Sequence, residues 1–231
     1  MRLLIATTLA VWAAIPVQGA DLPVVASRLV TGPDSHVDLT NTSAQPVTAW
    51  TLVVTTMEKD GRTRRAVETI DAYLSEVTRD FPGMSSRVDR LMAGQTRQMM
   101  IDPAAAGAVA EVTAVVLEDG TAAGDRETIA SIFESRARQR DQLQEVVQVF
   151  EAVLPSSRGA AALEELKRRF AAPPSSPEST AHRAAREAID TYLQRTTPAN
   201  ADAIDQLVRS YAAIVRREHD LAERHSHQKT P

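Results

Sequence analysis

The stretch NTSAQPVTAWTLVVTT, residues 41–56, predicts a turn followed by a β-strand. Asn41, Ser43 and Pro46 are residue types that form turns, and β-branched residues follow them. From Val47 onward the side chains divide into two alternating sets, and either set can be buried. The more apolar set contains Trp50, Leu52 and Val54. We therefore expect a strand whose tryptophan lies between two packed sheets.

Further strands are predicted on both sides of this stretch. Asp60 and Gly61 form a dipeptide typical of a β-hairpin turn. Strand patterns also occur in LPVVASRLV (22–30), SHVDLTN (35–41), QTRQMMI (95–101) and AEVTAVVLEDGT (110–121). In the last segment the inward set is either Val112, Ala114 and Val116 or Val115 and Leu117. Short strands with turns at near-regular spacing are typical of a sandwich.

A long connection, residues 68–94, interrupts the strand pattern. It is longer than an ordinary hairpin loop, and a turn of helix is expected within it around residues 70–77. Long connections on a rigid scaffold are frequent positions for functional residues.

Two features of this region resemble a known kind of domain. Asn41 precedes the strand PVTAWTLVV (46–54), and a turn from Gly94 to Thr96 introduces the next strand pattern. Over roughly residues 24–120 the chain resembles the immunoglobulin-like sandwich of small secreted bacterial proteins, including the FxLyD-type domains. The stretch VVLEDGTAAGD (115–125), leading into a helix, is similar to the end of secreted bacterial proteins of this design. The resemblance implies a fold and assigns no catalytic residues.

From Asp125 the apolar residues recur in steps of three and four, which is typical of an amphipathic helix. The first helix is predicted over residues 125–154, with Asp125 as N-cap, Glu127 in the first turn and Pro155 beyond its end. Its stripe consists of Ile129, Ile132, Phe133, Arg136, Leu143, Val146, Val147, Phe150, Val153 and Leu154.

Three more helices are predicted near residues 159–171, 178–195 and 199–225. The proline-containing segments 171–179 and 196–200 separate them, and Ser176 is the possible N-cap of the third helix. Residues 226–231 are expected to be a disordered tail. The sequence thus predicts a segregated α+β chain, with an N-terminal immunoglobulin-like antiparallel β-sandwich (21–124) and an all-helical C-terminal part (125–225).

Residues 1–20, MRLLIATTLAVWAAIPVQGA, have the pattern of a cleaved signal peptide. Arg2 precedes an apolar run shorter than the roughly 20 residues that span a bilayer, and small residues close it. Cleavage would leave Ala20 or Asp21 as the first residue; an uncleaved N-terminal anchor is the alternative. The chain has no cysteine, which excludes disulfides and lipoprotein acylation. We expect a periplasmic or secreted protein with no membrane span in the mature chain.

The charge pattern excludes nucleic acid as a partner. The chain has a net charge of −4, and aromatic residues make up only 4% of it. Residues 21–124 hold 9 basic and 14 acidic side chains, whereas residues 125–231 hold 16 of each. Nucleic-acid binding requires a basic surface, and single-strand binding also requires aromatic platforms.

One group of residues near the C-terminus suggests a metal site. His219 and Glu223 lie one helical turn apart, and His225 and His227 follow them. The alternative is a set of solvated polar residues, because the chain offers no Cys ligand and no second acidic cluster nearby in sequence. We favour this alternative, so the sequence predicts no metal and no cofactor.

Two other patterns have simple structural interpretations. Asp34, Ser35 and His36 are adjacent, and a catalytic triad must instead be assembled by the fold, so we expect a turn before a strand. A set of basic residues interleaves with acidic ones, and we expect these residues to form solvent-exposed faces. The basic residues are Arg136, Arg138, Arg140, Lys167, Arg168 and Arg169.

These patterns favour an exported, non-catalytic binding or structural module. The helical part is the expected surface for a protein partner or for self-association. The alternative is an enzyme or a metal-binding protein with its site in a cleft between the sandwich and the helices.

Overall fold

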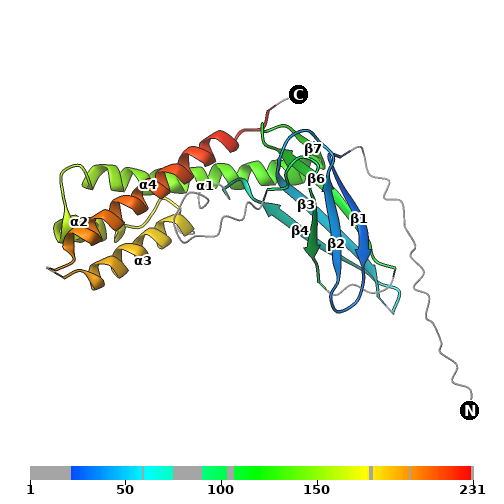
Figure 1. Cartoon of the computed structure of the whole chain (residues 1–231), viewed down its shortest axis with the longest axis horizontal. Coiled ribbons are helices and arrows are strands. Elements are labelled where there is room, and N and C mark those ends of the chain that lie inside the picture. The colour runs from blue at the N-terminus through cyan, green and yellow to red at the C-terminus, as the bar shows by residue number, and fades with distance from the viewer. Residues whose placement is uncertain are drawn as a thin grey trace, which may run out of the picture.

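The computed structural model describes residues 22–58, 60–74, 90–102, 107–176, 179–197 and 199–229. In this part of the chain seven strands precede four helices, which confirms the segregated α+β architecture (Figure 1). The strands are β1 (Val24–Val30), β2 (His36–Asn41), β3 (Val47–Met57), β4 (Thr63–Asp71), β5 (Thr96–Met100), β6 (Val109–Leu117) and β7 (Ala122–Gly124). The helices are α1 (Arg126–Val153), α2 (Gly159–Phe170), α3 (Thr180–Arg195) and α4 (Ala201–His225). The predicted signal peptide, residues 1–20, lies outside the described residues.

The strands form two antiparallel sheets, with the orders β1-β2-β5 and β4-β3-β6-β7. An apolar core fills the space between the sheets, and it includes Trp50, Leu52 and Val54 from β3. The predicted inward face of this strand is therefore confirmed. β7 is a strand that the sequence analysis did not identify.

The opposite face of β3 is also buried at its first half, because α1 packs against it. Ala49 joins Ala114 and Val116 of β6 in a cluster with Ile129 and Phe133 of α1. The side chain of Ala49 is fully buried as a result. This contact fixes the first part of α1 to the four-stranded sheet.

A bulge in β6 combines the two predicted inward sets. Val115 and Leu117 pack in the sandwich core, as one alternative predicted, and Val112 of the other set also lies there. Opposite Thr51 and Leu52 of β3 stand Ala114 and Val112, so Thr113 is an extra residue. The extra residue reverses the alternation. Val112 before the bulge and Val115 after it both lie in the sandwich core.

The predicted hairpin between β3 and β4 is confirmed. Gly61 has a φ of 82°, and the Glu58 N–H donates to the Arg62 carbonyl at 2.8 Å. β4 continues to Asp71, so a helical turn cannot begin at residue 70 as expected. A single 3₁₀ turn occupies residues 73–74, and the rest of the expected turn, residues 75–77, lies outside the described residues.

The connection from β7 to α1 depends on a glycine. Gly124 has a φ of 111°, and a Cβ at this position would lie 2.2 Å from the Thr113 carbonyl oxygen. The next residue, Asp125, is the N-cap of α1, as predicted, and accepts a hydrogen bond from the Thr128 N–H at 2.8 Å. The close approach at Gly124 therefore determines where α1 leaves the sheet.

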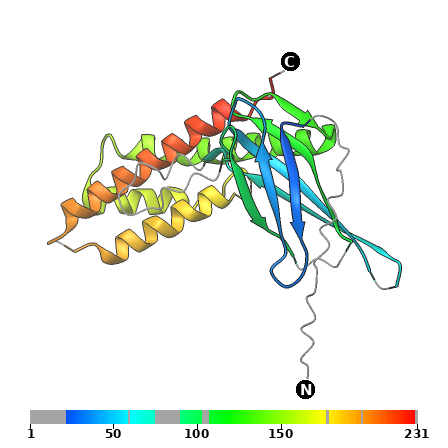
Figure 2. The same cartoon turned by 45° about the vertical axis from the view of Figure 1, so that its right-hand side comes forward.

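The four helices form a second apolar core that extends to one side of the sandwich (Figures 1 and 2). We call residues 126–225 the helical region. In its core the Phe150 ring lies 5.6 Å from that of Phe170 and 5.9 Å from that of Tyr211, each measured between ring centroids. The N-cap of α3 is Ser179, not Ser176, because the Ser179 side chain accepts from the His182 N–H. No helix among the described residues is both long and apolar enough to span a membrane.

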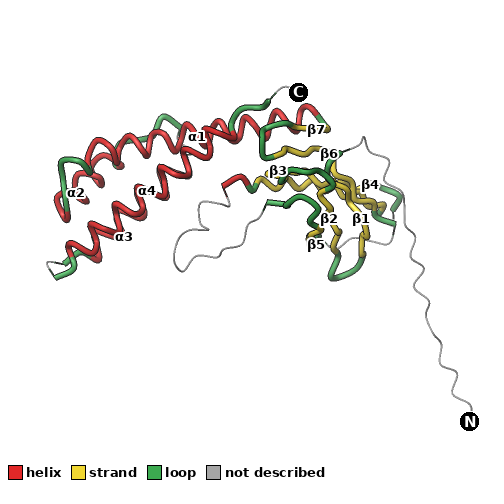
Figure 3. The backbone as a smooth tube through the Cα atoms, turned by 45° about the horizontal axis from the view of Figure 1, so that its top comes forward, coloured by secondary structure: helices red, strands yellow, loops and turns green. Residues whose placement is uncertain are grey.

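The end of α4 returns to the sandwich beside β7 (Figure 3). The Lys229 N–H donates to the Gly120 carbonyl at 3.0 Å, and Ser226 is only 6% exposed. The expectation of a disordered tail is therefore wrong for residues 226–229; residues 230–231 lie outside the described part. The polar composition predicted fraying, but the sandwich supplies hydrogen-bond partners for this backbone.

Candidate functional site

Arg136 of α1 is buried where the helical region meets the sandwich. Its side chain has no exposed surface, so the expectation of a solvent-exposed face is wrong for this residue. Its Nε and Nη2 donate to the two carboxylate oxygens of Asp71, at 2.9 and 2.8 Å. A bidentate pair of this kind is among the stronger hydrogen-bonded contacts in proteins. It joins α1 directly to the end of β4.

The same guanidinium holds two further segments. Nη2 donates to the Thr48 hydroxyl of β3 at 3.1 Å, and Nη1 donates to the His225 carbonyl of α4 at 3.2 Å. The guanidinium carbon also lies 4.8 Å from the centre of the Tyr73 ring, within cation–π distance. We call Thr48, Asp71, Tyr73, Arg136 and His225 the junction.

Tyr73 and His225 complete the junction. The Tyr73 hydroxyl donates to Gln139 at 2.7 Å, and burial, followed by the nearby Asp71 carboxylate, raises its pKa. The His225 ring packs against the Tyr73 ring, and its Nε2 lies 3.8 Å from Glu118. Its Nδ1 is buried and has no hydrogen-bond partner among the described residues. Burial lowers the pKa of His225 more than the Glu118 carboxylate raises it, so the neutral imidazole is favoured.

Acidification is expected to weaken the junction through His225. The folded-state pKa lies below the unfolded value of about 6.5. The contribution of the neutral His225 ring to folding stability is therefore fully present above pH about 6.5. It is lost as the pH falls through the folded-state pKa of His225. The free energy of unfolding is measured in urea at pH 7.5 and at pH 5. Between these two pH values it should fall less for His225→Gln than for the unchanged chain.

The variant comparison is needed because other groups titrate in the same range. Burial also lowers the pKa of His182, whereas burial raises that of Glu218, which acts in the opposite direction. His227→Gln is the matched control, since the His227 side chain is 67% exposed. If the free energy of unfolding depends on pH equally in His225→Gln and His227→Gln, the prediction is contradicted.

The predicted metal candidates have different partners. His225 is buried at the junction, and His219 lies 3.5 Å from the carboxylate of its neighbour Asp220. His227 Nε2 lies 4.0 Å from Glu223. Within the described ranges, no three His, Cys, Asp or Glu side chains are grouped so that they could hold a metal ion.

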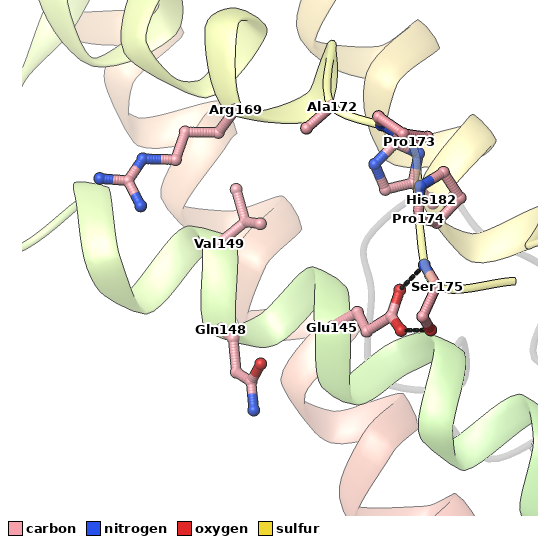
Figure 4. Close-up of a pocket in the computed structure, with 9 residues that line it drawn as sticks. All are labelled: Glu145, Gln148, Val149, Arg169, Ala172, Pro173, Pro174, Ser175 and His182. Carbon is pink, nitrogen blue, oxygen red and sulfur yellow. Dashed lines mark hydrogen bonds between the residues drawn. The ribbon is translucent and has the colours of Figure 1, made fainter.

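A pocket of about 380 Å³ lies on the helical region, not between the helices and the sandwich (Figure 4). α1, the end of α2, the connection after it and the start of α3 form the pocket. Its lining residues are Glu145, Gln148, Val149, Arg169, Ala172, Pro173, Pro174, Ser175 and His182. Pro173 and Pro174 have fixed φ angles and end α2, which holds this connection against α1.

Several polar groups of the pocket have partners within the chain. The Ser175 hydroxyl and N–H both donate to the Glu145 carboxylate, so the hydroxyl is not directed to His182 (Figure 4). Arg169 donates to Glu165 at 2.9 Å. The His182 ring packs edge-on against Phe170, and burial lowers its pKa. The pocket thus has both apolar and charged residues in its lining.

The remaining predicted residues occupy structural positions. The Ser35 hydroxyl donates to the Gly32 carbonyl at 2.6 Å, and β2 begins at His36, so this segment is a turn before a strand. Arg168 and Arg169 both contact Glu165, as expected for an exposed face with interleaved charges. Arg140 contacts Asp141 but is only 23% exposed, and it also donates to the buried Ser226 hydroxyl, so the expectation of exposure is not met there.

Neither the junction nor the pocket was identified from the sequence. The one local signal for the junction was the position of Arg136 inside an apolar stripe. The pocket residues come from three separate segments, and only the two prolines indicated an ordered connection.

No protein-family model, curated protein or solved structure matched this chain. The resemblance to FxLyD-type domains therefore stays a prediction.

Proposed function

We propose that this chain is an exported, non-catalytic binding module in which the helical region presents the surface for a protein partner. The pattern of residues 1–20 supports export to the periplasm or beyond the cell. In this proposal the sandwich is the base to which the helical region is fixed.

The observation that carries the proposal is the filled junction. The alternative function, an enzyme or a metal-binding protein, places its site in a cleft between sandwich and helices. At that position Arg136 donates to Asp71, Thr48 and the His225 carbonyl. Buried charges with this many partners hold segments in fixed positions, and they leave Arg136 little capacity to bind a substrate.

The pocket face is the favoured part of the helical region for the partner. It combines apolar side chains, Val149 and Ala172, with charged groups, Glu145 and Arg169. Interfaces commonly use such a mixture, with an apolar centre for affinity and polar groups for specificity.

A photoreactive amino acid at position 148, which lies on the pocket, tests this function in the organism that produces the protein. We expect one discrete covalent adduct with a second protein, attached to a mature chain whose mass corresponds to a start at Ala20 or Asp21. Arg169→Glu should weaken the adduct, because it reverses a charge of the pocket.

Position 134 supplies the matched control, since Glu134 is exposed on the same helix but does not line the pocket. Equal labelling at positions 134 and 148, or no adduct at either, contradicts the proposed surface. A chain that keeps residues 1–20 contradicts export with cleavage.

A further inference from the structure

β4 is a long sheet edge that differs from the other three edges of the sandwich. All nine of its residues pair with β3 without a shift in register. Its other side pairs with no strand in the described part of the chain. The β3–β4 hairpin also extends beyond the rest of the sandwich (Figure 2).

The other edges carry features that limit pairing with a further strand. β1 has an irregular register after Ser27, and Arg28 has a φ of 45°. β7 has three residues and β5 has five. Bulges and short length are two of the devices that protect sheet edges, and β4 has neither. Charged side chains are a third device, and of these three it is the only one that β4 carries.

The charges along β4 are divided between its two ends. Arg64 and Arg65 stand in the first half, Ala66 and Val67 in the centre, and Glu68 in the second half. Val67 is 59% exposed. A strand with a basic first half and an acidic second half is complementary to itself when two copies run antiparallel.

Symmetry selects one register for such a pair. The two copies are related by a two-fold axis perpendicular to the sheet. Two residues can then stand opposite each other across the new strand pair only if their side chains lie on the same face of the sheet. With Ala66 on the axis, Arg64 of each copy lies opposite Glu68 of the other. With Arg65 on the axis two arginines are opposed, and with Val67 on the axis Arg64 lies opposite the apolar Ile70.

We propose that two copies of this chain associate through antiparallel pairing of their β4 strands, centred on Ala66. The two four-stranded sheets then form one continuous eight-stranded sheet. The Arg64 side chain is 60% exposed and lies 3.6 Å from Asp102, a weak contact that leaves it available to Glu68 of the second copy. This association is independent of the partner surface on the helical region.

Light scattering on the mature chain over a wide concentration range tests the proposal. The unchanged chain should form dimers. Arg64→Glu and Glu68→Arg should each raise the dimer Kd by about tenfold or more, because each opposes like charges twice. An equimolar mixture of the two variants should form a heterodimer, since both crossed pairs are then attractive.

Arg62→Glu is the matched control. It changes the net charge as Arg64→Glu does, but position 62 lies opposite Ile70 in this register, so dimers should remain. If the unchanged chain is a monomer at every concentration, the proposal is overturned. The β4 edge would then be open to pairing with an extended segment of another protein. Unchanged association in both single variants, or a mixture that does not associate, also overturns the proposal.

Discussion

Arg136→Met is expected to lower the free energy of unfolding by about 3 kcal/mol. Met occupies a similar volume, so the loss comes from the missing charge and donors and not from a cavity. Asp71, Thr48 and the His225 carbonyl all lose a donor. The Asp71 side chain remains 24% exposed, which places the effect at the lower end of the range for a broken buried pair. Urea unfolding of residues 21–231 measures this loss.

Arg138→Met provides the control for this prediction, because Arg138 is exposed on the same helix. Its effect should be below about 0.5 kcal/mol. Adding Asp71→Asn to Arg136→Met should recover part of the stability, since it removes the unpaired carboxylate. Equal stability of Arg136→Met and Arg138→Met means that the buried pair does not stabilise the fold.

Gly124→Ala is expected to cost about 3 kcal/mol or more. Two causes add: a non-glycine residue at a φ of 111° is strained, and the new Cβ would lie 2.2 Å from the Thr113 carbonyl oxygen. Backbone cannot move away as a flexible side chain can, so β7 and the start of α1 must shift. Urea unfolding of residues 21–231 gives the free-energy change, and hydrogen exchange should be faster at the start of α1.

Gly107→Ala separates the two causes. Gly107 has a φ of 86°, but no atom of the described residues lies within 4 Å of the position of a Cβ. Its substitution should cost only about 1 to 2 kcal/mol, from the backbone strain alone. If both variants lose the same stability, the close approach at Gly124 is unimportant.

The sequence predicted the elements whose signals are local. The hairpin at Asp60–Gly61, the inward face of Trp50 and the N-cap Asp125 all follow from a few neighbouring residues. β7 was missed because three residues give no detectable alternation, and it exists through its pairing with β6. The α3 start was misplaced because Ser176 and Ser179 both have the residue type of an N-cap, and only the structure distinguishes them.

The junction shows why contacts between distant segments could not be predicted from the sequence. Arg136 stood in the correct apolar stripe, which is a local signal for burial. Its charge partner Asp71 precedes it by 65 residues, and Thr48 and His225 lie 88 and 89 residues away. A single sequence contains no record of such pairings. The bulge at Thr113 was not predicted for the same reason, because it depends on the register in which β6 pairs with β3.

The return of α4 to the sandwich determines what the helical region can reach. α1 has 28 residues, so at about 1.5 Å per residue it spans about 40 Å from the sheet to its far end. The chain travels out along α1 and comes back along α4, and Lys229 ends beside Gly120. The far end is therefore built from internal connections, and the last described residue, Lys229, lies beside the sandwich. Both ends of the helical region therefore lie at one anchoring point on the sandwich, and its far end is held away from that point by internal connections alone.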